Sequence, residues 1–154
     1  MEYFTRVIGL PKGKKYNSLK IPLMFKKNQR FIISFIRGLF DTDGCLNLKR
    51  GYKYNKSYPV IVGSSKSKDF MAEISTILKS LNFKVREYFD KIKPDDRVEN
   101  GFTIISSLEL PGHENLIRWM RVINFWSPKH LQKYELWKLR NIGNIRINSS
   151  GSWI

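Results

Sequence analysis

The chain has 154 residues, which is enough for one domain with its own hydrophobic core. Its 28 Lys and Arg residues against 13 Asp and Glu residues give a formal net charge of +15, and the basic residues are spread along the whole sequence. Such a charge favours a basic surface on a folded domain and a polyanionic partner, of which nucleic acid is the usual one. Aromatic residues make up 14% of the chain, which excludes a disordered basic tail.

Several classes of site and location are excluded by the composition. Cys45 is the sole cysteine, so the chain has no internal disulfide and no Cys-rich zinc site. The two histidines, His113 and His130, are too few and too far apart to predict a metal cluster. The apolar run at residues 31–40 is too short to span a membrane, and it contains Arg37. The N-terminus lacks the apolar segment of a signal peptide, so we expect an intracellular protein, in the cytoplasm or an organelle matrix.

Residues 1–27 are basic and irregular, with Pro11, Gly13 and Pro22 interrupting any regular pattern. Two interpretations stay open for this segment: an arm that lies on nucleic-acid phosphates, and a solvated basic N-terminus. We expect the chain to consist of this arm, a core domain over residues 28–143 and a C-terminal tail over residues 144–154.

The first predicted helix begins after Asn28, whose side chain can accept a hydrogen bond from a free backbone N–H group. Ser34 and Gly38 lie four residues apart and therefore on one face of this helix. Glycine inside a helix costs about 1 kcal/mol relative to alanine, so its presence requires a reason. A stripe of small residues lets a second backbone approach closely. We therefore expect this face to pack against the same helix of a second chain.

Two acids, Asp41 and Asp43, end this helix, where the helix dipole disfavours each carboxylate by about 0.3–1 kcal/mol. Acids at an unfavourable position indicate a bound cation. In a symmetric pair of helices the two Asp43 carboxylates would meet at the two-fold axis, where they repel unless a proton or a metal lies between them. Oxygen ligands of this kind suit Mg²⁺, and paired divalent metals are a recurrent solution for phosphodiester cleavage.

The rest of the chain shows alternating strand and helix patterns. Alternation of apolar and polar residues predicts strands over residues 45–49 and 84–89. β-Branched residues predict another over residues 58–63, and a fourth strand is expected over residues 102–108. Polar segments with turn residues predict loops at residues 51–57 and 91–101. Helical periodicity predicts three further helices, over residues 68–81, 113–123 and 129–140. Ser67 is the expected N-cap of the first of these, and Asn82 its C-cap.

The simplest packing of these elements is an α+β fold, with one antiparallel four-stranded sheet and all helices on one of its faces. The other face is then open, and it is expected to carry the side chains of Asn47, Lys49, Lys84, Arg86 and Tyr88. A bare basic sheet face can lie along a DNA groove, with Lys and Arg contacting phosphates or guanines. A solvated face without a partner is the alternative, and the net charge of +15 makes it the weaker one.

Residues 36–44, with the sequence IRGLFDTDG, resemble the signature motif of the LAGLIDADG homing endonucleases. Five residues match the motif letter for letter: Gly38, Leu39, Asp41, Asp43 and Gly44. Arg37 and Thr42 depart from it. Ile21-Pro22 is similar to the segment that precedes the motif in this family, and the resemblance covers about residues 21–140. It implies an αββαββα core, in which a curved four-stranded antiparallel sheet has its helices on one face.

The resemblance also implies a function. Homing endonucleases of this family hydrolyse both strands of a long DNA site, with divalent metal at the base of paired signature helices. One motif supplies half of such a site, so the expected protein is a homodimer on a near-palindromic duplex, with Mg²⁺ or Mn²⁺ as its metal. Its interface would include Ser34, Gly38 and Asp41. Arg37 is either a contact to the partner or an exposed residue at the helix edge.

Individual roles follow from the same resemblance. Asp43 matches the metal-binding acid, and Gly44 matches a residue whose carbonyl oxygen helps to hold the metal. Asp41 either accepts backbone N–H groups and fixes the turn, or touches the metal. Lys129 resembles a recurrent basic position in intein-type relatives, and its alternative is a solvated lysine in the first turn of a helix. Ser64 lies where relatives place a polar residue that positions water, or it is a turn residue that ends the second strand.

Two other functions share this fold and its basic surface. One is an intron RNA maturase, and the other is a DNA-binding protein without catalytic activity. Neither requires a metal-binding acid. The presence of both Asp41 and Asp43 therefore favours cleavage over either alternative.

Overall fold

A computed structural model of the chain describes residues 19–50 and 57–141. The predicted arm up to residue 18, the first predicted loop at residues 51–56 and the predicted tail lie outside this part. The elements follow one another as α2 (Leu23–Lys26), α3 (Gln29–Thr42), β1 (Cys45–Arg50), β2 (Ser57–Ser65), α4 (Lys68–Ser80), β3 (Arg86–Pro94), β4 (Phe102–Pro111), α5 (His113–Val122) and α6 (Pro128–Asn141). The predicted order of helices and strands is confirmed, with α2 as an addition.

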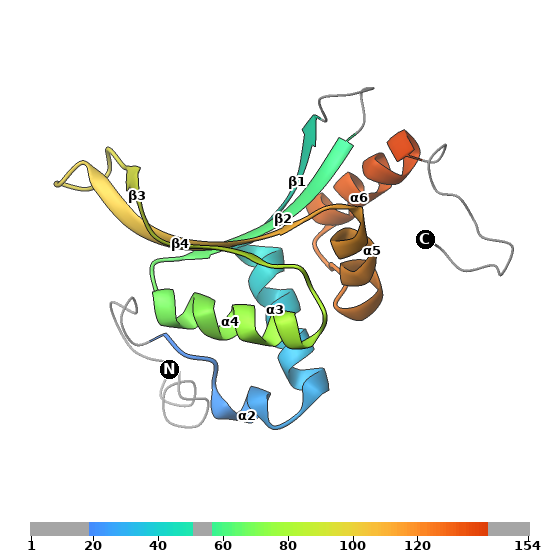
Figure 1. The fold of residues 1–154 in the computed structure, drawn as a ribbon, viewed down its shortest axis with the longest axis horizontal. Coiled ribbons are helices and arrows are strands. Elements are labelled where there is room, and N and C mark those ends of the chain that lie inside the picture. Colours follow the sequence, from blue (N-terminus) through green and yellow to red (C-terminus); the bar gives the residue numbers. More distant parts are fainter. Residues whose placement is uncertain (1–18, 51–56, 142–154) are drawn as a thin grey trace, which may run out of the picture.

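The four strands form one antiparallel sheet in the order β1-β2-β4-β3. Figure 1 shows that the sheet is curved, that α3, α4 and α5 lie on its convex side, and that its concave side is open. This arrangement confirms the predicted α+β architecture. An open face remains because side chains alternate along β1 and along the first part of β3. Leu46, Leu48, Glu87 and Phe89 lie on the helix side, and the residues between them lie on the other face.

Local signals explain where the first helices begin. The Asn28 side chain accepts a hydrogen bond from the Arg30 backbone N–H at 2.8 Å, and Ser67 accepts one from the Phe70 N–H at 3.3 Å. Both are therefore the N-caps that the sequence predicts. Asn82 follows the C-cap of α4 and has a φ of 63°, the left-handed conformation that Asn tolerates better than most residues.

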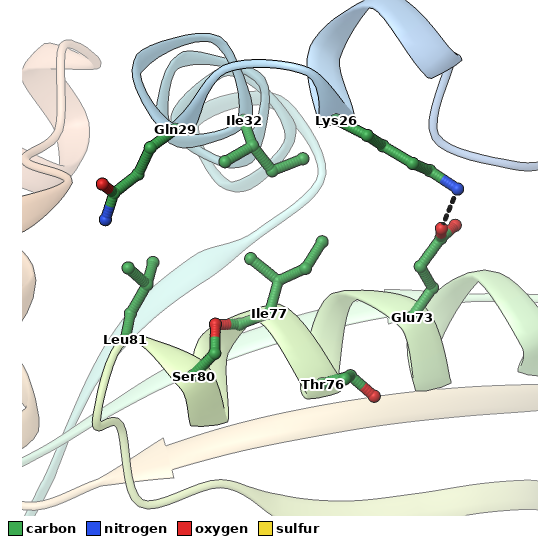
Figure 2. Close-up of a pocket in the computed structure, with 8 residues that line it drawn as sticks. All are labelled: Lys26, Gln29, Ile32, Glu73, Thr76, Ile77, Ser80 and Leu81. Carbon is green, nitrogen blue, oxygen red and sulfur yellow. Dashed lines mark hydrogen bonds and ion pairs between the residues drawn. The ribbon is translucent and has the colours of Figure 1, made fainter.

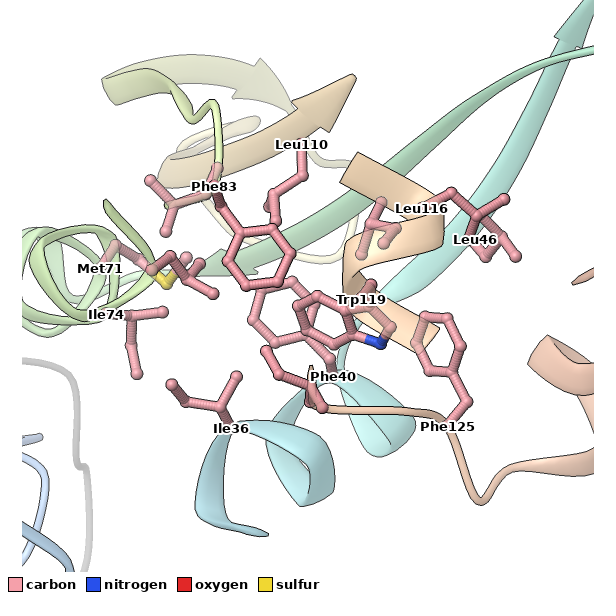
Figure 3. Close-up of a cluster of buried hydrophobic side chains, with 14 of the residues drawn as sticks. Ile36, Phe40, Leu46, Met71, Ile74, Phe83, Leu110, Leu116, Trp119 and Phe125 are labelled. Atoms are coloured by element: carbon pink, nitrogen blue, oxygen red, sulfur yellow. The ribbon is translucent and has the colours of Figure 1, made fainter. Parts of the chain in front are cut away.

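The hydrophobic core joins α3 to the sheet and to α5. Phe40 and Trp119 lie at its centre, with their ring centroids 4.8 Å apart and almost no exposed surface on either side chain. Figure 3 shows side chains from both helices, α4 and the strands converging on this pair. Ile21, which belongs to the segment predicted as an arm, is also buried in the core. The end of α3 is thus held rigidly against the sheet.

Two glycines allow Phe40 to lie this close to the strands. A Cβ at Gly44 would come within 2.6 Å of the Phe40 carbonyl oxygen, and one at Gly63 within 2.7 Å of the Phe40 ring. Gly38 differs, because a Cβ there would meet nothing within 4 Å among the described residues. The glycines of the motif therefore have different roles: Gly44 permits packing inside the chain, and Gly38 faces away from it.

Replacing Gly44 with alanine is expected to lower the free energy of unfolding by about 1–3 kcal/mol, because its Cβ must displace backbone atoms of α3. Gly38→Ala is the matched control. It should raise the free energy of unfolding by roughly 0.5–1 kcal/mol, since it removes a flexible residue from an exposed helix position. Urea denaturation at a protein concentration low enough for the chain to be monomeric measures both, and an unchanged midpoint for Gly44→Ala would contradict the assigned packing.

The β3–β4 hairpin is longer than predicted. β3 begins at Arg86 rather than residue 84 and continues to Pro94, into the predicted loop at residues 91–101. A bulge between Tyr88 and Lys91 shifts the register there. Beyond the bulge the β3 side chains are exposed, including the apolar Ile92, so this part of the strand has no buried face.

Candidate active site and nucleic-acid interface

The carboxylate of Asp43 lies at the exposed C-terminal end of α3. Asp43 is the C-cap of this helix, and its backbone N–H donates to the Leu39 carbonyl at 2.9 Å. Its side chain makes no hydrogen bond or ion pair with any residue that the structure describes. Both oxygens are therefore without a partner among the described residues, at a position that the helix dipole makes unfavourable for an acid.

Asp41 has a different environment from Asp43, although they are two residues apart. Its carboxylate accepts hydrogen bonds from the backbone N–H groups of Trp126 at 2.9 Å and Ser127 at 3.2 Å. It thus holds the segment between α5 and α6 against the end of α3. This geometry favours the interpretation of Asp41 as a residue that accepts backbone N–H groups and fixes the turn.

Arg37 is engaged within the chain, so the expectation of an exposed residue at the helix edge is wrong. Its Nε donates to the Ile123 carbonyl at 2.5 Å, and its guanidinium lies 4.7 Å from the centre of the Trp126 ring. The side chain is half-buried. Arg37 and Asp41 together bind the segment that leads into α6, so the departure from the signature motif at Arg37 has a structural explanation.

One face of α3 is left uncovered in the described part of the chain. Phe31 is 52% exposed, and Ser34 and Gly38 are exposed one and two turns further along. The Ser34 hydroxyl donates back to the Arg30 carbonyl at 2.9 Å, so the side chain lies against its own helix. We call Phe31, Ser34 and Gly38 the seam of α3. It ends near Asp43.

Four of the five residues predicted for the open sheet face lie on it. Asn47 and Lys49 alternate along β1 with two leucines that pack on the helix side. The strand pairing carries the same face across β2 and β4 to Arg86 and Tyr88 on β3. These polar residues therefore lie on β1 and β3, the two outer strands of the sheet (Figure 1).

Lys84 is the exception. It precedes β3, and its backbone N–H donates to the Asn115 side-chain oxygen at 3.0 Å. Its ammonium group forms an exposed ion pair with Glu114 at 2.6 Å, which lowers the pKa of that carboxyl group. The expectation that Lys84 alternates with Arg86 on one strand is wrong, because the β3 ladder starts only at Arg86.

Ser64 lies within β2, which continues to Ser65, so it is not a turn residue. The pairing of Val62 with Cys45 places Ser64 two residues beyond the point where β1 begins. It is exposed on the open face, on the side of the sheet where the Asp43-Gly44 turn enters β1. The structure therefore brings Ser64 into the neighbourhood of the acids.

Lys129 and Lys133 lie one turn apart on α6. Lys129 is exposed and contacts no other described residue through an ion pair. Lys133 is half-buried, and its Nζ lies 3.5 Å from the Cys45 sulfur, directly after the Asp43-Gly44 turn. The Cys45 thiol in turn donates to the Asn47 side-chain oxygen at 3.1 Å. Lys133 was not identified from the sequence; the i, i+4 spacing from Lys129 is the one signal that could have indicated it.

His130 is buried below this region, and neither of its ring nitrogens has a hydrogen-bond partner in the structure. Burial lowers the pKa of His130 below its ordinary value of 6.5. The nearby Asp41 carboxylate opposes this pKa shift, and the Lys133 and Lys129 ammonium groups add to it. The neutral ring packs on Phe125 with a centroid distance of 4.8 Å.

Lowering the pH from 7 to 5 is therefore expected to reduce the free energy of unfolding. The unfolded chain binds a proton at His130 near pH 6.5, whereas the folded chain binds it at a lower pH, so stability rises with pH across this window. One such proton contributes at most about 1.4 kcal/mol per pH unit. His130→Phe should flatten this part of the pH profile in urea denaturation. If the slope is the same in that variant, another group is responsible.

No group of three or more His, Cys, Asp or Glu side chains in the described residues could hold a metal by itself. One chain thus offers the Asp43 carboxylate, with the Gly44 carbonyl beside it in sequence. These hard oxygen donors fit Mg²⁺ or Mn²⁺, which take a few protein ligands and complete their shell with water and phosphate oxygens.

No helix of the described part is long and apolar enough to cross a membrane.

A surface pocket lies elsewhere, between α2, α3 and α4 on the helix side of the sheet. Figure 2 shows its lining, which includes the ion pair of Lys26 with Glu73 and the apolar side chains of Ile32, Ile77 and Leu81. None of the predicted site residues lines it. The candidate site is therefore an open surface rather than this pocket.

Comparisons with known proteins agree with this geometry. The sequence model described as a LAGLIDADG-like domain matches residues 30–118, which include α3, the whole sheet and α4. The chain is also 28% identical over 120 residues to the replicative DNA helicase DnaB of Rhodothermus marinus. That match covers 78% of this chain but 12% of the helicase, so the chain spans only a small part of its relative. Because the domain match extends over more than half of the chain, with the motif at the end of α3, the chain belongs to the LAGLIDADG homing endonuclease family.

Proposed function

We propose that this protein is a site-specific double-strand DNA endonuclease, in which two copies of the chain form the active site where their α3 helices meet. The observation that carries the proposal is the contrast between the two acids of the motif. Asp41 is used inside the chain, whereas Asp43 is exposed, without a partner in the described residues, and beside the uncovered seam. An acid without a structural role, at an unfavourable helix end, supports a role in binding a cation.

The seam supports the proposal of a homodimer. Packing two α3 helices along Phe31, Ser34 and Gly38 would cover apolar surface, and Gly38 has room for a close approach by a second backbone. A two-fold axis through this contact makes the interface isologous and brings the two Asp43 side chains together. The preferred DNA target would then be a near-palindrome.

The residues of the site have distinct proposed roles. Asp43 and the Gly44 carbonyl would hold Mg²⁺ or Mn²⁺, which when bound activates water and stabilises charge on the scissile phosphate. Ser64 would orient water near the start of β1. Lys129 or Lys133 would stabilise the phosphate charge; Lys133 lies against Cys45 and is the better placed of the two. Asn47, Lys49, Arg86 and Tyr88 would contact the DNA along the concave face.

The proposal is tested by selecting duplexes that bind the protein in Ca²⁺ and then adding Mg²⁺. We expect paired cuts at one position on the two strands of the selected duplex, and no cuts when EDTA replaces the metal. Selection of structured RNA in preference to duplex DNA would support the maturase alternative. Specific binding to duplex DNA without cuts in either Mg²⁺ or Mn²⁺ would support a non-catalytic DNA-binding protein.

The alternative functions keep some support from the structure. The basic concave face serves RNA as well as DNA, and the net charge of +15 does not distinguish between them. Neither alternative gives a reason for the exposed carboxylate of Asp43, which is why cleavage is preferred. Light scattering gives an early test of the paired active site. A measured mass equal to two 18.2 kDa chains would support it.

A further inference from the structure

Glu109 is an acid near the middle of the face that is proposed to bind DNA. It lies on β4, where it pairs with Val62 of β2 on one side and with Arg86 of β3 on the other. Residues that are paired across strands point to the same face, so Glu109 shares the open concave surface with Lys49, Arg86 and Tyr88. A carboxylate in this place is unexpected, because it repels the phosphates of the partner.

The Glu109 carboxylate has basic residues as neighbours on both sides. Its Oε1 lies 3.8 Å from Lys49 Nζ, across β2 from β1. Its direct cross-strand neighbour on the other side is Arg86, whose Cβ is expected about 4.5–5.5 Å away. The Glu109 side chain is only 23% exposed, whereas that of Lys49 is 56% exposed. Glu109 is thus a partly buried carboxylate between two exposed basic residues from opposite edges of the sheet.

The physical consequence concerns which part of DNA these donors contact. Contacts to phosphates provide affinity without sequence information, and sequence is read at the base edges. A nearby carboxylate offsets part of the attraction of Lys49 and Arg86 for phosphates, since charges about 4 Å apart lie well within the Debye length of about 8 Å. The same carboxylate can accept a hydrogen bond from cytosine N4, next to a Lys or Arg that donates to guanine.

We propose that Glu109 is a specificity-determining residue, which orients Lys49 and Arg86 toward base edges and opposes their contacts to phosphates. This inference rests on the proposed function, because it requires the concave face to bind duplex DNA. Glu109 lowers the affinity for any DNA and raises the preference for the correct site. It does not take part in cleavage.

Glu109→Gln tests this role, because it keeps the shape of the side chain and removes its charge. Relative to the wild type, the variant should bind unrelated duplex DNA more tightly and lose roughly tenfold in its preference for the selected site. The slope of log K against log salt should grow by about one, the amount expected for one additional phosphate contact. Binding is measured in EDTA by fluorescence anisotropy over a range of salt concentrations.

Glu135→Gln is the matched control. Glu135 is an exposed acid on α6 that pairs with Lys138, so its replacement changes the net charge by the same amount away from the concave face. It should leave both the preference and the salt slope as in the wild type. Exposed ion pairs contribute at most about 1 kcal/mol, so both variants should fold, and thermal unfolding checks this.

A double-mutant cycle with Lys49→Met separates orientation from simple charge. If Glu109 acts partly through Lys49, the loss of preference caused by Glu109→Gln is smaller when Lys49 is already replaced. Unchanged preference in Glu109→Gln, or equal effects of Glu109→Gln and Glu135→Gln, would overturn the inference while leaving the proposed function intact. A wild type that shows no preference among duplexes would instead refute the proposed function itself, and this inference with it.

Discussion

Asp43→Asn is expected to abolish DNA cleavage while the metal-free protein still binds its DNA target. Metal-assisted hydrolysis depends on several kcal/mol of stabilisation by the bound cation, and each 1.36 kcal/mol corresponds to a factor of ten in rate. Loss of the metal-binding carboxylate should therefore slow cleavage by roughly a thousandfold or more. Cleavage of the selected duplex is measured in Mg²⁺, and binding is measured in EDTA.

The same variant should also be slightly more stable than the wild type. The Asp43 carboxylate has no hydrogen bond in the described residues and lies at the negative end of the α3 dipole, so its neutralisation removes an unfavourable interaction of about 0.3–1 kcal/mol. Higher stability together with lost activity is the behaviour of a residue that is retained for function. If Asp43→Asn also lost DNA binding in EDTA, the assignment of separate roles to the acid and the concave face would be wrong.

Asp41→Asn provides the contrast. Its carboxylate accepts hydrogen bonds from Trp126 and Ser127, and the amide that replaces it retains only one acceptor oxygen. Hydrogen bonds to a charged group contribute about 1.5–3 kcal/mol, so this variant should have a lower free energy of unfolding. The substitutions Asp43→Asn and Asp41→Asn should thus shift the urea midpoint in opposite directions. A shift of the same sign would contradict the geometry of the α3 terminus.

Gly38→Arg is expected to convert the protein into a folded monomer that does not cleave DNA. A side chain at Gly38 meets nothing within 4 Å among the described residues, so the variant should fold as the wild type does. In a symmetric pair of α3 helices, however, two arginines would occupy the closest approach of the backbones and repel each other. Light scattering measures the mass, and cleavage of the selected duplex in Mg²⁺ measures the activity.

Thr76→Arg is the matched control for this prediction. Thr76 is exposed on α4, away from the seam, and its replacement adds the same charge and bulk to a helix surface. It should leave the mass and the cleavage rate unchanged. A Gly38→Arg protein that keeps the mass of a dimer would show that the chains associate through another surface. A wild type that is itself a stable monomer would mean that one chain carries half of a catalytic centre.

Much of the fold could be predicted from the sequence because its signals are local. The N-caps at Asn28 and Ser67, the alternation along β1 and the motif at the end of α3 each depend on residues within a few positions of one another. These local preferences agree with the tertiary packing, so the order of elements and the antiparallel sheet were predicted correctly. The second half of β3 was not, because its residues are exposed on both faces beyond the bulge.

The sequence alone determined the family, the sheet architecture and the identity of the acids at the helix end. Only the tertiary structure decided how these residues divide their roles. Asp41 bonds to a segment 85 residues away, Lys133 reaches Cys45 from α6, and Glu109 lies beside Lys49 two strands away. Such contacts join residues that are distant in the chain, and no periodicity or local propensity encodes them. The first two arise because packing of Phe40 against the sheet brings the end of α3, the start of β1 and the start of α6 into one place, and the third arises from the pairing of β1, β2 and β4.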